Sequence, residues 1–203
     1  MVTLPGCEEL FLRYFDRWYD EDDRRRKGFI ATRPDMHTAN SLSPLSEMSQ
    51  RDVLHRIEAM LGAARKDWPR YLQVSGDVDL RWITTFDCYY DPECIEKVIE
   101  RSDPADYSND YLVLCCEFGT VLGHVMRCLQ PRLIWCCEWP YWESALLDPQ
   151  TGNLIPVFHW AVKKMSDYGW DDGFAEKVEV CLQHCAVLTP EVARNLWKRE
   201  SET

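Results

Sequence analysis

The sequence predicts an α+β fold: an antiparallel β-meander with helices packed mainly on one face, plus an N-terminal helical arm. Apolar residues recur at helical spacing along much of the chain. An alternating segment at 133–139 is followed by two further strand-like segments around a turn. Residues 31–48 are rich in Ser, Thr, Asn and Pro, which is typical of a linker. We therefore divide the 203 residues into an arm (1–48) and a single α+β domain (49–203).

The composition excludes several broad classes of protein. With 46% hydrophobic and 12% aromatic residues, the chain can bury a substantial core and is not wholly disordered. No stretch approaches the roughly 18 uncharged apolar residues that a membrane-spanning helix needs. The first residues lack the basic and apolar regions of an export signal. We expect a cytoplasmic protein with no membrane partner.

The net charge of −11 comes mainly from the second half of the chain. Acidic residues outnumber basic ones by nine to two over residues 87–117, and by eight to three over residues 134–180. Such a surface repels a phosphate backbone, so we expect no nucleic-acid partner. It would attract a basic protein, although acidic residues also serve simply to keep a protein soluble.

The ten cysteines lie mostly in apolar segments, and no export signal precedes them. We interpret them as reduced thiols rather than disulfides. Cys181, His184 and Cys185 have the spacing of one helix face and could form half of a metal site. Because structural zinc needs four ligands and the sequence has no CxxC or HxxxH pair, we expect neither a metal nor a cofactor.

The first half of the chain shows four helical patterns and one strand-like segment. Pro69 is expected to end or bend the second helix, and the four acids and four bases of residues 20–27 are interpreted as a solvated turn. Gly119 and Gly123 leave a bare stripe on the fourth helix, where another element can pack closely. The expected helices are 7–19, 49–69, 91–102 and 109–129, and the expected strand is Val78–Phe86.

The second half predicts the sheet and the last helices. The alternation over 133–139 predicts a strand nearly buried on both faces. Asp148-Pro149 and Gly152-Asn153 predict a turn between strands at 144–147 and 154–157. The remaining expected elements are a helix over 157–168 closed by Gly169 and helices over 174–185 and 189–197.

These motifs together resemble a loose set of small, uncharacterised bacterial α+β domains. The motifs are the glycine-bearing helix, the break at Pro131, the strand with Leu133 and Trp135, the DPxxGN turn and a helix closed by an acidic, glycine-containing turn. The resemblance covers about residues 87–175. Related forms of these domains occur among immunity proteins encoded beside toxins. The resemblance implies no catalytic residues.

Two acidic-aromatic clusters are the candidate partner-binding residues. Because Pro140 forces a turn in the first cluster, at least one of its rings should reach the surface. Aromatic rings beside carboxylates suit recognition of a basic protein, although the same rings could cap the ends of the core or line a ligand pocket. The residues are Glu138, Trp139, Tyr141, Trp142 and Glu143 in the first cluster, and Tyr168, Trp170, Asp171 and Asp172 in the second.

The leading hypothesis is a non-catalytic bacterial binding protein, specifically an immunity protein that neutralises a cognate toxin through this surface. The alternative is an enzyme or a small-ligand-binding protein whose site is assembled from dispersed residues. The sequence has no GxSxG, P-loop, GxGxxG or HExxH motif, so no catalytic residues are assigned. His159, beside Trp160, is the histidine best placed to test for a dyad with a cysteine. The sequence does not set the oligomeric state.

Overall fold

The computed structural model describes residues 2–19, 37–38 and 47–184. Its α+β class agrees with the sequence prediction, with helices predominating. The predicted turn at 20–27 and the predicted helix at 189–197 lie outside the described residues, as does Cys185. The element bounds are α1 Cys7–Tyr14, η1 Asp16–Trp18, β1 His37–Thr38, α3 Glu47–Tyr71, α4 Leu80–Tyr89, α5 Pro92–Arg101, α6 Asp110–Leu129, β2 Ile134–Cys136, η3 Tyr141–Glu143, β3 Ala145–Asp148, β4 Asn153–Ile155, α7 Val157–Lys164 and α8 Phe174–His184.

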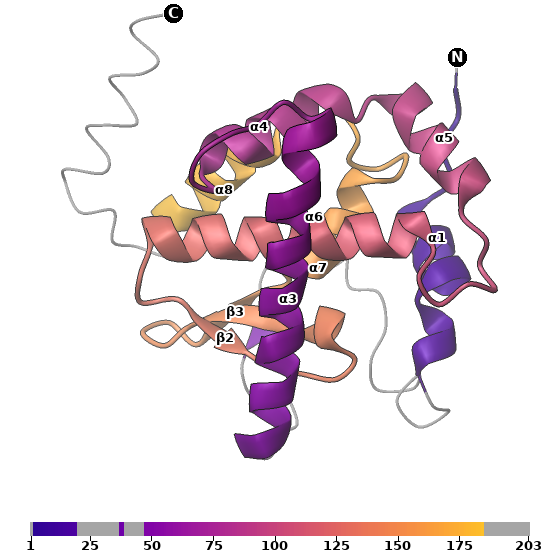
Figure 1. Cartoon of the computed structure of the whole chain (residues 1–203). Coiled ribbons are helices and arrows are strands. Elements are labelled where there is room, and N and C mark those ends of the chain that lie inside the picture. Colours follow the sequence, from indigo (N-terminus) through magenta and orange to yellow (C-terminus); the bar gives the residue numbers. More distant parts are fainter. Residues whose placement is uncertain (1, 20–36, 39–46, 185–203) are drawn as a thin grey trace, which may run out of the picture.

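Helix α6 is the centre of the molecule (Figure 1). Asn109 caps its N-terminus by accepting a hydrogen bond from the backbone N–H of Leu112, and most of the residues of α6 are buried. In Figure 1, α3 crosses in front of α6, while α7 lies behind it. Its length and composition would allow α6 to cross a membrane, but 72% of its apolar window is buried inside the protein, as in the core helix of a soluble protein.

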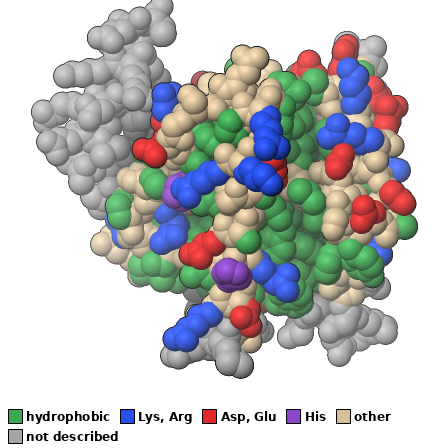
Figure 2. All heavy atoms as spheres, viewed as in Figure 1, with side chains coloured by type: hydrophobic (Ala, Val, Ile, Leu, Met, Phe, Trp, Pro, Cys, Tyr) green, Lys and Arg blue, Asp and Glu red, His purple; other side chains and the backbone are tan. Residues whose placement is uncertain are grey.

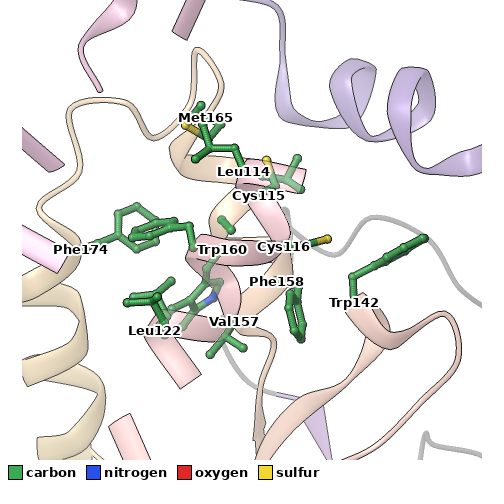
Figure 3. Packing of buried hydrophobic residues seen from close by; sticks show 14 of the residues in the cluster. Leu114, Cys115, Cys116, Leu122, Trp142, Val157, Phe158, Trp160, Met165 and Phe174 are labelled. Atoms are coloured by element: carbon green, nitrogen blue, oxygen red, sulfur yellow. The ribbon is translucent and has the colours of Figure 1, made fainter. Parts of the chain in front are cut away.

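The predicted glycine stripe is confirmed as a packing surface. A Cβ added at Gly119 would lie 2.9 Å from Cα of Phe158 in α7, so the two helix backbones meet there. A Cβ added at Gly123 would lie 2.4 Å from the indole ring of Trp135 in β2. Figure 3 shows Phe158 beside Cys116, near the same face of α6. The stripe therefore joins α6 to the elements that follow it.

The sheet has the strand order β1-β4-β3-β2, and every neighbouring pair is antiparallel. Leu147 pairs with both Ile134 and Leu154, which sets the register. The predicted turn at 148–153 is confirmed, because Asp148 accepts hydrogen bonds from Gln150 N and Thr151 Oγ1, and Gly152 adopts a φ of 72°. β1 falls within the segment expected to be a linker.

The strand predicted at Val78–Phe86 is wrong, because these residues form most of helix α4. Asp79 caps the helix by accepting a hydrogen bond from the backbone N–H of Arg81. Thr84 and Thr85 donate their hydroxyl protons to carbonyl groups one turn earlier. The buried side chains Trp82, Ile83 and Phe86 have helical spacing, so burial overrides β-propensity here.

Several boundaries also differ from the prediction. Helix α3 continues past Pro69 to Tyr71. The strand predicted over 133–139 shortens to three residues, and it is not buried on both faces, since Ile134 is 47% exposed. Helix α7 ends at Lys164 with Met165 as its cap, so Gly169 is not its C-cap. Gly169 instead lies against the Lys163 carbonyl, where a Cβ would be 2.7 Å from the oxygen.

The segment from Leu4 to Tyr19 packs into the same core as α6 and α7. Tyr14 stacks on Tyr111 of α6, with 4.7 Å between ring centroids, and donates a hydrogen bond to the Ile99 carbonyl. The predicted helix over 7–19 is α1 followed by the single turn η1. The division of the chain at residue 48 stays a prediction.

Replacing Gly119 by Ala should destabilise the protein by about 1–3 kcal/mol, because the new methyl group would press on the backbone of Phe158. Gly62→Ala in α3 is the matched control. Its added Cβ meets no described atom within 4 Å, so this change should stabilise the helix by about 0.5–1 kcal/mol. Chemical denaturation of both variants measures the difference. Equal free energies of unfolding would contradict the close approach of α6 and α7.

Candidate functional site

The first acidic-aromatic cluster is mostly part of the core. Glu138, Tyr141 and Trp142 are buried, while Trp139 is 40% exposed. Pro140 follows a cis peptide bond, and the next three residues form η3. The expectation that at least one ring reaches the surface is therefore confirmed by Trp139. The guanidinium of Arg56 in α3 lies over that ring, 5.2 Å from its centroid.

The buried side chains of this cluster hold the N-terminal segment. The Trp142 indole donates a hydrogen bond of 2.9 Å to the Tyr19 hydroxyl, which in turn donates to Glu143. Phe15 and Trp18 pack edge-on against the Trp142 ring. Burial, followed by the nearby Glu143 carboxylate, raises the pKa of Tyr19 well above its ordinary value, so its hydroxyl keeps the proton that it donates.

The second cluster lies in the loop between α7 and α8. Tyr168 and Trp170 are 58% and 38% exposed, and Asp171 is also exposed. Asp172 is half-buried and pairs with Lys177 at 3.3 Å. The ammonium of Lys163 lies 4.1 Å from the centroid of the Tyr168 ring.

The backbone of this loop is held firmly. The Lys164 ammonium, which is 1% exposed, donates a 2.6 Å hydrogen bond to the Trp170 carbonyl. The N–H of Tyr168 donates to Ser166 Oγ, and the N–H of Asp172 donates to the Gly169 carbonyl. The loop therefore presents its exposed rings from a fixed backbone.

A buried ion pair fixes the end of the loop. Lys164 Nζ lies 3.4 Å from Oδ1 of Asp87 in α4. Oδ2 of the same carboxylate accepts hydrogen bonds from the N–H groups of Phe174 and Ala175, which begin α8. The two acidic-aromatic clusters are not brought together in one patch. The first packs against α3 and against residues 15–19, which follow α1, and the second extends from the far end of α7.

His159 is 3% exposed, and its Nε2 lies 3.6 Å from Oε2 of Glu143. Its ring centroid is 5.4 Å from that of Phe11 in α1. These neighbours give His159 a place in the packing of α1 against α7. A catalytic dyad of His159 with a cysteine stays a prediction.

Sequence reasoning missed an imidazole–thiol pair on α6. His124 Nε2 lies 3.6 Å from Sγ of Cys128 and 3.4 Å from a guanidinium nitrogen of Arg65. Burial lowers the pKa of His124, and Arg65 and Arg127 lower it further, so the ring favours its neutral form. The helical i, i+4 spacing of His124 and Cys128 was the available signal.

The structure forms no disulfide among the cysteines that it describes, and the reduced state stays a prediction. Cys115 and Cys116 are fully buried in α6, and burial raises the pKa of Cys116 to about 12. Within the described residues, no group of three His, Cys, Asp or Glu side chains is arranged to hold a metal ion. The proposed half-site at 181–185 lies partly outside the described residues.

Comparisons of the chain with protein-family models, with curated proteins and with solved structures found no match.

Replacing Trp142 by Ala should cost about 3–5 kcal/mol of stability, because it empties a core site and leaves the Tyr19 hydroxyl without its indole donor. The same change at the exposed Trp139 should cost less than about 1 kcal/mol. Thermal denaturation followed by circular dichroism compares the two variants. Equal melting temperatures would show that the Trp142 ring does not anchor the N-terminal segment.

Alkylation should report ten free thiols in denatured protein prepared without reductant. Among the described cysteines, Cys88 and Cys128 should react first in the folded protein, because both are exposed. Cys115 and Cys116 should be protected by burial and by their raised pKa values. Peptide mass mapping after short and long labelling measures the order. Two or more disulfides in fresh protein would refute the reduced state.

Proposed function

We propose that the chain is a non-catalytic binding protein that recognises a basic protein partner through the loop between α7 and α8. This loop, defined as residues 167–172, is named the recognition loop. The single observation that carries the proposal is the exposure of Tyr168 and Trp170 on a backbone that Lys164 and Ser166 hold in place. An exposed aromatic ring contributes little to the stability of the fold. In protein interfaces, by contrast, aromatic rings are strong anchors.

A fixed backbone favours binding because less conformational entropy is lost when the partner docks. The recognition loop needs little ordering, since Trp170 and Asp172 are already tied to α7 by hydrogen bonds from Lys164. Only the side chains have to find their bound rotamers. The rings can then fill a pocket of the partner with little loss of conformational entropy.

The charges favour a basic partner over an acidic one. Asp167 and Asp171 are exposed beside the rings, and the whole chain carries a net charge of −11. Lys163 already lies over the Tyr168 ring, which indicates that this ring can accept a cation.

The role of the first cluster in this proposal is smaller. Tyr141 and Trp142 are buried, so a partner could reach only Trp139 without rearranging the core. We assign Trp139 as a separate contact outside the recognition loop. Glu143 accepts a hydrogen bond from Tyr19, and the backbone of Glu138 exchanges hydrogen bonds with Ser144, so we give both residues a part in holding the segment around η3.

The biological role that fits this chemistry is that of a bacterial immunity protein, which neutralises a cognate toxin in the cytoplasm. The architecture proposed with it is a meander of β2, β3 and β4 with helices packed mainly on one face. The sequential antiparallel pairing of these strands supports the meander. Support for the role comes from the acidic surface, the exposed rings and the resemblance of residues 87–175.

The test is surface plasmon resonance against the protein encoded by the neighbouring gene. Trp170→Ala should weaken binding by about 2 kcal/mol or more, mainly through faster dissociation, because it removes an anchor. The melting temperature should stay nearly unchanged, because the Lys164 bond uses the backbone carbonyl of Trp170. Leu12→Ala, at an exposed apolar residue of α1 outside both acidic-aromatic clusters, is the control and should bind as the parent protein does.

Reversing a charge on the recognition loop separates long-range electrostatic attraction, which speeds association, from the direct contacts that slow dissociation. Asp171→Lys should slow association and reduce its dependence on salt, because charges at an interface rim act over about 10 Å at 0.1 M ionic strength. Measuring at two salt concentrations detects this change. If Trp170→Ala and Asp171→Lys both bind like the parent protein while remaining folded, the recognition loop is not the binding surface.

A further inference from the structure

A cleft opens where α3, α4, α5 and α6 meet, away from the recognition loop. It has a volume of about 440 Å³, which is in the range of small-ligand sites. Figure 2 shows hydrophobic side chains exposed beside the basic side chains of α3 on this side of the molecule. Its lining includes Tyr71, Tyr89, Tyr90 and Glu117, with Lys97 and Arg101 among the charged residues. We call it the tyrosine cleft.

Three tyrosine rings form the aromatic part of the lining. The Tyr71 and Tyr89 centroids are 6.2 Å apart, and those of Tyr89 and Tyr90 are 5.0 Å apart with the planes at 73°. Tyr89 is 43% exposed, while Tyr90 is buried. Burial raises the pKa of both Tyr71 and Tyr90 well above the ordinary value, so both phenols stay neutral. The rings therefore supply π-faces without adding charge.

Glu117 is the unusual member of the lining. It is 93% buried on the most apolar helix, and its Oε2 accepts a 2.8 Å hydrogen bond from the indole of Trp68. Among the described residues no lysine or arginine forms an ion pair with it. A glutamine would accept the same hydrogen bond without the cost of burying an ionisable group, so packing alone does not explain a glutamate.

The other charged side chains at the cleft are already compensated or lie at its exposed rim. Arg101 Nε is 2.6 Å from Oδ2 of Asp110. Asp67 pairs with Arg70 at 3.3 Å, and both are partly exposed. Lys97 is exposed. The buried part of the tyrosine cleft thus combines aromatic rings with one carboxyl group.

We propose that the tyrosine cleft binds an organic cation, an alkylammonium or alkylguanidinium group whose charged head contacts Glu117 and whose alkyl stem lies among Tyr71, Tyr89 and Tyr90. Ammonium and guanidinium groups are attracted to aromatic faces, and they form their strongest hydrogen bonds with carboxylates. The group can belong to a free small molecule or to a lysine or arginine side chain of another protein. The site does not depend on the recognition loop.

Binding should be linked to protonation of Glu117. Burial raises the pKa of this carboxyl, the Trp68 hydrogen bond opposes the rise and the Asp67 charge adds to it, which together bring the pKa to about 7. The neighbouring titratable and charged groups are Asp67 and Tyr71 of α3, Tyr89 and Tyr90 of α4 and its end, Cys94, Lys97 and Arg101 of α5, and Asp110 of α6. A cation favours the ionised form, so it binds more weakly as the pH falls below 7.

Isothermal titration with n-butylguanidinium is the direct test, with n-butylurea as its neutral analogue. We expect one site per chain for the guanidinium, at least tenfold weaker binding of the urea, and a roughly tenfold loss of affinity from pH 8 to pH 6. The pH effect follows from the ionised fraction of Glu117. Equal binding of both compounds, or no binding of the guanidinium, would overturn the proposal.

Two variants assign the binding to the carboxylate. Glu117→Gln keeps an acceptor for the Trp68 indole, and it should weaken n-butylguanidinium binding at least tenfold and remove the pH dependence. Lys97→Gln, at the rim, should leave binding unchanged or slightly tighter. A folded Glu117→Gln protein that binds like the parent, or a loss of binding in Lys97→Gln, would overturn the proposal.

An NMR titration of the Glu117 side-chain carboxyl in the unmodified protein gives a measurement that needs no variant. Saturating n-butylguanidinium should lower the pKa of this carboxyl, and an unchanged pKa would contradict direct contact. A capped Gly-Gly-Arg-Gly-Gly peptide separates the two sources of the cation. Binding as tight as that of the small guanidinium indicates a protein side chain, and exclusion of the peptide indicates a free small molecule.

Isothermal titration of the Trp170→Ala variant with n-butylguanidinium distinguishes this proposal from the proposed function. Trp170→Ala should leave n-butylguanidinium binding unchanged, because Trp170 does not line the tyrosine cleft. Conversely, loss of partner binding in that variant with an intact response to n-butylguanidinium would leave both proposals standing. A simultaneous loss of both activities in a folded Trp170→Ala protein would contradict the independence of the two sites.

Discussion

The close approach of α6 and α7 at Gly119 is the constraint on which the rest of the structure depends. Because Gly119 has no side chain, the backbone of Phe158 can lie against α6, and this brings α7 to the centre of the core. Helix α7 then positions three other parts of the molecule: His159 faces α1, Trp160 faces Phe174 of α8, and Lys164 reaches both Asp87 and the loop that follows. A larger residue at one position would therefore disturb elements that are far apart in the sequence.

Sequence reasoning predicted the fold best where local signals and burial agree. The apolar face of α6 and the turn at Asp148 each have a local chemical cause, and each was predicted. It failed at α4, where threonine and isoleucine favour a strand but the spacing of Trp82, Ile83 and Phe86 matches a buried helix face. It also overestimated the strand before η3, because alternation alone does not reveal that Ile134 lies at the sheet edge.

The candidate sites were harder to predict, for a physical reason. An acidic-aromatic run looks the same in the sequence whether its rings lie inside or outside, and the structure places Trp142 in the core but leaves Trp170 exposed. What separates them is a tertiary contact, the hydrogen bond from Trp142 to Tyr19 more than a hundred residues away. The tyrosine cleft could not be predicted from the sequence for the same reason: tertiary contacts between α3 and α6, which are separate in the sequence, form it. Its one sequence signal was an acidic residue, Glu117, within an apolar helix.

The attachment of the N-terminal segment has a consequence for how the chain can be divided. Leu10, Phe11, Tyr14 and Phe15 are almost completely buried against the rest of the protein, and Tyr19 ends the segment with hydrogen bonds to η3. The affinity that holds this segment comes from side-chain contacts rather than from its covalent link to β1. Two separately produced pieces, one ending just after Tyr19 and the other containing the remainder, therefore have the complementary surfaces of a split protein.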